Sequence, residues 1–178
     1  MMKRFVAGII CVIMLTLFAG TGLAVQAQYA NTIAFLKKMD DLGITYTVEG
    51  INEKEQEKIT IKNSGDQISY TLVYFFNKDN TECDIRVWYV LYYDAAEFDN
   101  VLRAVNKLNN TYKYCTWIAD DSDSTITVTC DVILRENGDV GDIVTDATMN
   151  VVDIIDDAYA NVLGVYDINA APAAEKTP

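Results

Sequence analysis

Carboxylates and hydroxyls gather in one short segment of the chain, Asp120-Asp121-Ser122-Asp123-Ser124. Such alternating oxygen donors are the ligands that a hard cation such as calcium prefers. The segment lacks the glycine and the distant glutamate of an EF-hand loop, and turns between strands favour aspartate and serine for their own backbone geometry. We therefore expect a turn here and assign no metal ligand.

Paired carboxylates could also hydrolyse glycosidic bonds. With 26 Asp and Glu residues among 178, however, some pair will fall near the required separation by chance. The sequence contains no histidine, which excludes Ser-His and Cys-His nucleophile pairs and imidazole metal ligands. We expect no catalytic residue and no cofactor, and predict that the protein is not an enzyme.

The charge balance limits the class of partner. Lys and Arg number 14 against 26 acidic residues, giving a formal net charge of −12 and a sequence pI near 4.3. Nucleic-acid binding needs clustered Lys and Arg, so we expect no nucleic-acid partner. The length predicts one domain with a sizeable core.

The first residues have the pattern of a secretory signal peptide. Met1-Met2-Lys3-Arg4 is followed by an apolar run, Phe5–Ala19, and by small residues at the −3 and −1 positions of Val25-Gln26-Ala27. We predict a signal peptide over 1–27 with cleavage after Ala27. The alternative is an uncleaved anchor, although the apolar run is shorter than the ~20 residues that span a bilayer.

Cleavage would leave a chain beginning at Gln28, and the loss of two cations would take the formal net charge from −12 to −14. The protein is then expected to be secreted or held in the cell envelope, without stable membrane insertion after signal cleavage.

Hydrophobic periodicity predicts an α+β domain over 28–165 and a disordered tail over 166–178. The element order is α-β-β-β-β-α-β-β-α, an antiparallel sheet with three helices against it. The expected helices lie at 31–43, 94–110 and 142–161, and the expected strands at 44–48, 58–62, 70–76, 84–93, 112–119 and 125–134.

Register arguments predict which sides of the strands face the core. With Phe76 opposite Thr81 across a four-residue turn, Leu72 faces Ile85 and Ile68 faces Tyr89 on an apolar side. A one-residue slip would bury Asp84 and Arg86, which is costly. In the second hairpin, Trp117 opposite Val128 and Ala119 opposite Ile126 form the core side, whereas Thr116, Thr127 and Thr129 point outward.

The opposite side of the first hairpin predicts a candidate interface. Phe75, Trp88, Val90 and Tyr92 can form a continuous aromatic and apolar stripe, with Arg86 at its edge. Such a stripe would suit a partner protein or a second copy of the chain. The alternative is that the first or last helix covers the stripe and buries it.

Three cysteines lie beyond the predicted cleavage site. The hairpin register places Cys115 opposite Cys130, where a disulfide is geometrically reasonable. A pair of buried free thiols is the alternative, and both remain open at this point. Cys83 is expected to be a small buried hydrophobe.

The stretch Phe98–Asn110, with Asn106-Lys107-Leu108-Asn109 at its end, followed by Thr116-Trp117-Ile118 and the strand Thr125–Leu134, resembles the YbjN domain family. The resemblance covers most of 31–163 in element order. It implies a fold like that of type III secretion chaperones, pairing into dimers, and a scaffold that binds proteins rather than an enzyme. The family offers no catalytic residues to carry over, and the signal sequence is a departure from cytoplasmic secretion chaperones.

We therefore expect an exported, non-enzymatic protein-binding or chaperone-like module, a homodimer or the partner of another protein. Two alternatives remain: a small envelope domain that captures a ligand or peptide between helix and sheet, with a cystatin-like architecture, and a carboxylate-dependent hydrolase.

Overall fold

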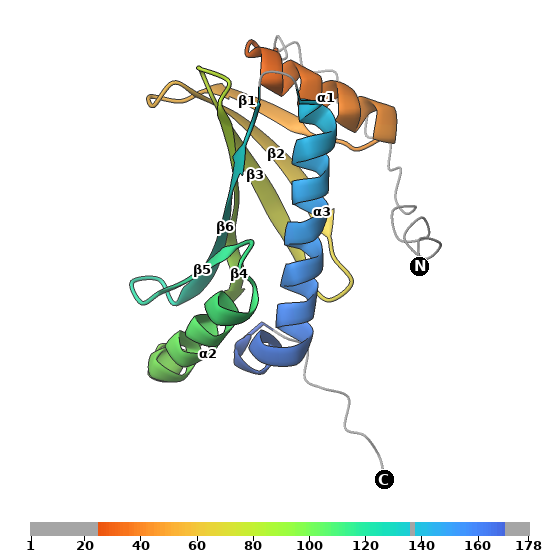
Figure 1. The fold of residues 1–178 in the computed structure, drawn as a ribbon. Helices are drawn as coiled ribbons and strands as arrows, with labels where there is room; N and C mark the ends of the chain where they lie inside the picture. The colour runs from red at the N-terminus through yellow and green to blue at the C-terminus, as the bar shows by residue number, and fades with distance from the viewer. Residues whose placement is uncertain (1–24, 136–137, 170–178) are drawn as a thin grey trace, which may run out of the picture.

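The α+β architecture expected from the sequence is present in a computed structural model that describes residues 25–135 and 138–169 (Figure 1). Six antiparallel strands form one sheet in the order β1-β2-β3-β4-β6-β5. The elements are α1 (Ala30–Leu42), β1 (Thr47–Ile51), β2 (Gln56–Ser64), β3 (Ser69–Asn77), β4 (Glu82–Tyr92), a 3-10 turn η1 (Ala95–Glu97), α2 (Phe98–Thr111), β5 (Thr116–Asp120), β6 (Thr125–Ile133), α3 (Val140–Ala158), a π-helical turn η2 (Tyr159–Leu163) and a 3-10 turn η3 (Gly164–Tyr166).

The helices bury one side of the sheet. Figure 1 shows α3 running along that side, with α1 lying across its beginning, and α2 packs against β5. Phe35 of α1 lies at the centre of the core, with its ring centroid 4.8 Å from that of Tyr74 and 5.5 Å from that of Phe76. All three side chains are fully buried.

The first strand begins three residues later than predicted. Gly43 takes the left-handed conformation (φ +69°) that ends α1, and the N–H of Ile44 still bonds to the Met39 carbonyl. Ile44 therefore completes the helix terminus instead of starting a strand. The turn that follows β1 is held by Asn52, whose side-chain oxygen accepts the N–H groups of Lys54 and Gln56.

The β3–β4 hairpin keeps the predicted sides but not the predicted register. Phe76 lies opposite Cys83 instead of Thr81, and Tyr74 opposite Ile85. Because the shift is two residues, the shift itself moves no side chain to the other side of the sheet. The turn lies one residue further along the chain, at 78–81, where the Asp79 carboxylate accepts both the N–H and the hydroxyl of Thr81 and keeps Thr81 out of the strand.

A β-bulge in β4 overturns two side assignments. Between Val87, opposite Val128, and Leu91, opposite Ile126, β4 carries extra residues that β6 does not match. Tyr89 adopts φ +58° there and turns outward, 53% exposed, although regular alternation predicted it in the core. Val90 turns inward and joins the core at 5% exposure, so its place in the outer stripe was wrong.

The second hairpin confirms its predicted register, with Trp117 opposite Val128 and Ala119 opposite Ile126. Asn109, at the end of α2, ties the helix to β5. Its side-chain oxygen accepts the Trp117 N–H at 2.7 Å, and its amide donates to the Trp117 carbonyl at 2.9 Å. Asn109 thus fixes the helix end to the edge strand.

The folded chain continues past the predicted boundary at residue 165. The N–H of Ile168 donates to the Tyr92 carbonyl at 3.0 Å, and Asp167 accepts the Tyr159 hydroxyl at 2.8 Å. Tyr166 packs against the core, which holds this segment in place. Residues 170–178 of the predicted tail and 1–24 of the predicted signal peptide lie outside the described residues. Within residues 25–135 and 138–169, no helix has the length and apolar character needed to cross a membrane.

Tyr74 links the sheet to α3. Its hydroxyl lies 3.1 Å from that of Thr148, and Thr148 itself donates to the Val144 carbonyl. Since a threonine hydroxyl has one hydrogen, Tyr74 must be the donor. Burial raises the pKa of Tyr74 well above its usual value.

Tyr74→Phe is expected to lower the free energy of unfolding by about 1 kcal/mol at neutral pH, because one buried hydrogen bond is lost. The folded state holds the Tyr74 proton more tightly than the unfolded state does. Stability should therefore fall as the pH rises past about 10, the unfolded value, and Tyr74→Phe should lessen that fall. Urea unfolding at neutral and alkaline pH measures both effects. Tyr92→Phe, which changes an exposed ring, is the control. If Tyr74→Phe lost as much stability above pH 10 as the wild type, the raised pKa of Tyr74 would be contradicted.

Candidate functional site

The outward side of the sheet carries the predicted interface residues. We call this surface the open face and define it by Val73, Phe75, Asp84, Arg86, Trp88, Tyr89 and Tyr92. No helix of the described part of the chain lies over it in Figure 1. The structure thus brings Phe75, Arg86, Trp88 and Tyr92 onto one surface, adds Tyr89, and removes Val90.

Phe75 is covered by its neighbours on the sheet. The edge of one ring meets the face of the other in its contact with Trp88, with centroids 5.8 Å apart, and the Arg86 guanidinium lies 5.5 Å from the Phe75 centroid. Phe75 is consequently only 8% exposed. It supports the open face from beneath, and the outer layer is formed by Trp88 and Arg86.

Arg86 is held in place by Asp84, two residues away on β4. The Arg86 Nε donates to Asp84 Oδ2 at 2.7 Å, and Nη2 contacts the same oxygen. Asp84 Oδ1 is buried and has no hydrogen-bond partner among the described residues, and Asp131 lies directly opposite on β6. Asp84 therefore orients Arg86, while its second carboxylate oxygen is closed to a partner.

Tyr89 and Tyr92 form an exposed aromatic pair at the bulge. Their rings are parallel within 1°, with centroids 5.8 Å apart, and they are 53% and 40% exposed. The left-handed backbone of Tyr89 costs on the order of 1 kcal/mol for a residue that is not glycine. The bulge exposes two aromatic rings to water, which is unfavourable for the isolated fold. Such irregular strands with exposed aromatic side chains are typical of binding surfaces.

Sequence reasoning missed Tyr89 because it assumed regular alternation. The run Trp88-Tyr89-Val90-Leu91-Tyr92-Tyr93 is apolar or aromatic at every position. In a regular strand, alternate side chains point to opposite sides, so any register would expose three of these large apolar or aromatic side chains to water. That continuous run was the available signal for an irregularity.

A hollow of about 390 Å³ lies where β3 and β4 separate, and it opens to solvent. The pairing of the two strands ends at Val73 opposite Arg86, and the bulge in β4 follows. Trp88 and Tyr89 form one wall, Val73 another, and the Lys58–Glu49 ion pair, with a 2.7 Å contact, lies at the rim. The hollow could accept an apolar side chain from a partner.

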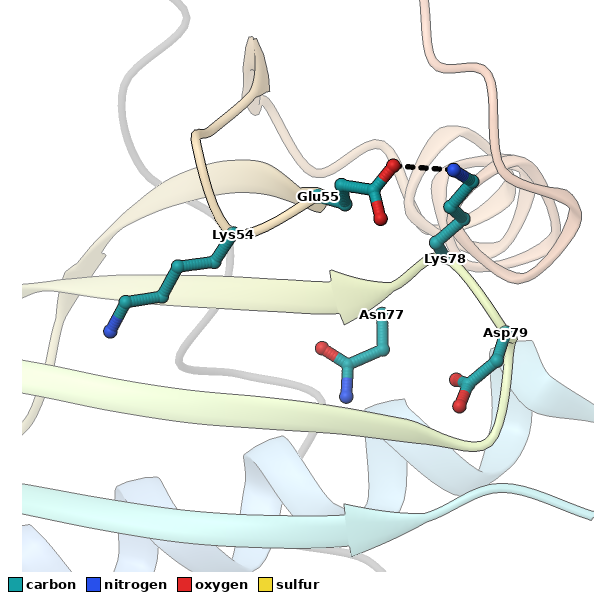
Figure 2. Close-up of a pocket in the computed structure, with 5 residues that line it drawn as sticks. All are labelled: Lys54, Glu55, Asn77, Lys78 and Asp79. Atoms are coloured by element: carbon teal, nitrogen blue, oxygen red, sulfur yellow. Dashed lines mark hydrogen bonds and ion pairs between the residues drawn. The ribbon is translucent and has the colours of Figure 1, made fainter.

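A second hollow of similar volume has a different character. Figure 2 shows Lys54, Glu55, Asn77, Lys78 and Asp79 around it, on the loop between β1 and β2 and on the turn between β3 and β4. Lys78 pairs with Glu55, while Lys54 points away from that pair. The two hydrogen bonds from Thr81 lower the pKa of Asp79. Most of these polar groups already have partners within the chain, so this hollow is the weaker candidate.

The acidic segment at 120–124 is the β5–β6 turn, as predicted. Asp120 accepts the Ser122 N–H at 2.9 Å and the Ser122 hydroxyl at 2.6 Å, and these bonds lower the pKa of Asp120. Asp123 accepts the hydroxyl of Thr125. Within the residues that the structure describes, no group of three or more His, Cys, Asp or Glu side chains is placed to hold a metal ion.

Cys115 and Cys130 flank the Thr116–Thr129 pair at the start of the second hairpin, and both are buried and present as thiols. A hydrogen bond between them, together with burial, raises the pKa of Cys115. Burial also raises the pKa of Cys83, which is fully buried as predicted. Closure of this pair into a disulfide stays a prediction.

Mild oxidation of the purified protein should join Cys115 to Cys130 within one chain and leave Cys83 as a thiol. Mass spectrometry should show the loss of two hydrogens, and Cys115→Ser should abolish that loss while Cys83→Ser should preserve it. Closing a loop of ~15 residues should add about 3 kcal/mol to the free energy of unfolding. Oxidation that joins two chains, or that consumes Cys83, would contradict the hairpin geometry.

The comparison with known proteins adds no assignment: no protein-family model matches this chain, and no curated protein matches it.

Proposed function

We propose that this chain is an exported, non-enzymatic protein-binding module that pairs with a second copy of itself through the open face. The observation that carries the proposal is the exposed Tyr89–Tyr92 stack beside Trp88 on a side of the sheet without a covering helix. The resemblance of the Asn106–Asn109 helix end and its hairpin to YbjN proteins supports a scaffold that binds proteins.

The residue types on the open face favour a protein partner. Tryptophan, tyrosine and arginine carry most of the binding energy at protein interfaces, because each combines a large contact area with a polar group. Trp88, Tyr89, Tyr92 and Arg86 lie close together here, with Phe75 beneath them. A hollow beside them could receive a side chain from the other copy.

Charge also favours this face for pairing two copies. The chain has a net charge of −12, so two copies repel one another over most of their surfaces. On the open face, Lys58 is paired with Glu49 and Arg86 with Asp84, which brings the local charge near balance. The outer side of α3, by contrast, carries Asp153 and Asp157. A two-fold arrangement that packs one open face on another would place the least repulsive surfaces together.

The space between helices and sheet gives less support to a small-ligand site. Phe35, Tyr74 and Phe76 fill its centre with close ring contacts. Both hollows described above lie outside that layer. The open face is therefore better suited to binding than the space between helices and sheet.

The proposal is tested by light scattering coupled to size exclusion on the exported protein at two concentrations. The wild-type chain is expected to elute as a dimer. Trp88→Ser and Tyr92→Ser should each weaken the dimer by roughly 30-fold, the effect of losing an interface residue worth about 2 kcal/mol.

Met149→Ser is the matched control, because Met149 is 49% exposed on α3 and lies away from the open face. It should leave the dimer unchanged. Circular dichroism checks that each variant folds, and Tyr89→Ser replaces Trp88→Ser if the latter unfolds. A wild-type chain that is monomeric at both concentrations would overturn self-pairing.

A further inference from the structure

Glu57 is a fully buried carboxylate near the start of β2. Its Oε1 accepts the backbone N–H of Gln28 at 2.8 Å, and its Oε2 accepts that of Tyr29 at 3.0 Å. No Lys or Arg of the described chain forms an ion pair with it. A buried anion supported only by two amides is expensive, because neither amide carries a compensating charge.

The neighbouring charges do not supply the missing cation. Glu55 lies two residues away on the same segment, and its carbonyl accepts the Tyr29 hydroxyl at 3.0 Å. Lys78, on the β3–β4 turn, is paired with the Glu55 carboxylate. On the neighbouring strands, Glu57 lies opposite Ile51 and Phe76, which are uncharged.

The sequence places a cation at this point after processing. Cleavage after Ala27 would turn the Gln28 nitrogen, the atom 2.8 Å from Glu57 Oε1, into the first atom of the chain. We infer that Glu57 is the binding site for the α-ammonium group of the processed chain, and that this buried ion pair forms only when the leader is removed. The inference rests on the export and cleavage proposed above.

The chemistry of the step is peptide hydrolysis by a peptidase of the export pathway. Water adds across the Ala27–Gln28 bond, Ala27 leaves with a carboxylate, and Gln28 keeps the amine, which takes up a proton at neutral pH. One neutral N–H donor is replaced by three donors on a positive charge. Charge-assisted hydrogen bonds are roughly twice as strong as neutral ones.

The ion pair would strengthen the attachment of α1 to the sheet. Tyr29 is the residue that precedes α1, and the next contact along the chain joins Asn31 to Asn80 through two hydrogen bonds of 3.2 and 2.7 Å. Gln28, Tyr29 and Asn31 thus fix the helix start to β2 and to the β3–β4 turn. The processed chain should be more stable than the precursor.

The test uses the full chain, expressed with its own leader in a secreting bacterial host and purified from the exported fraction. Intact mass identifies the first residue. Reductive methylation with formaldehyde then labels amines, and the N-terminal peptide is quantified by mass spectrometry. In the native wild type, this amine should react about tenfold more slowly than in Glu57→Gln, which corresponds to a pKa raised by about one unit.

Glu53→Gln is the matched control, an exposed glutamate in the turn before β2, and should react like the wild type. If Glu57→Gln does not fold, a chain with one alanine inserted between Ala27 and Gln28 replaces it. That insertion keeps Glu57 and moves the amine out of reach, so it should label faster and melt at a lower temperature than the wild type.

The outcomes separate the two proposals. A retained leader, or a first residue other than Gln28, would overturn the proposed cleavage and the ion pair with it. A chain that starts at Gln28 but labels equally fast in native and urea-unfolded samples would overturn the ion pair alone. A mass lower by one ammonia would show a cyclised glutamine without a free amine, which also overturns the ion pair.

Discussion

The bulge between Val87 and Leu91 is the constraint on which the outward surface depends. β4 is paired on both sides, to β3 as far as Arg86 and to β6 with a register shift between Val87 and Leu91. The extra residues turn Val90 into the core and release Tyr89 to solvent. The same irregularity separates β4 from β3 and opens the hollow beside Trp88. The bulge in β4 thus accounts for both the Tyr89–Tyr92 pair and the hollow beside it.

Much of the fold could be predicted because side-chain periodicity records burial directly. The sides of β3, β5 and β6, and of β4 as far as its bulge, followed from alternation, and Trp117 opposite Val128 was correct. The β3–β4 register was not recoverable, because a two-residue shift leaves each residue on the same side and periodicity cannot distinguish the two pairings. The decisive interaction was the Asp79–Thr81 bonding inside the turn, which depends on atomic geometry.

The candidate sites illustrate the same limit. Phe75, Trp88 and Tyr92 were placed on the open face by alternation, whereas Tyr89 and Val90 exchanged places because a bulge interrupts the period. Glu57 lies just outside the strand predicted over 58–62, and a carboxylate beside other charges is normally solvated. Its alternation with Ile59 and Ile61 was the signal that it faces the core. Only the three-dimensional contact with Gln28 shows what such a carboxylate can bind.

The two margins of the sheet bear on how copies of this chain can meet. β1 and β5, the outermost strands, are five residues long each, and β1 is interrupted at Gly50, which has φ +92°. Short or irregular margins offer few consecutive unpaired amides to another chain, so they resist the strand-to-strand growth that leads to fibres. Such margins disfavour open-ended stacking of copies, and the proposed two-fold contact between open faces would be closed by its own symmetry.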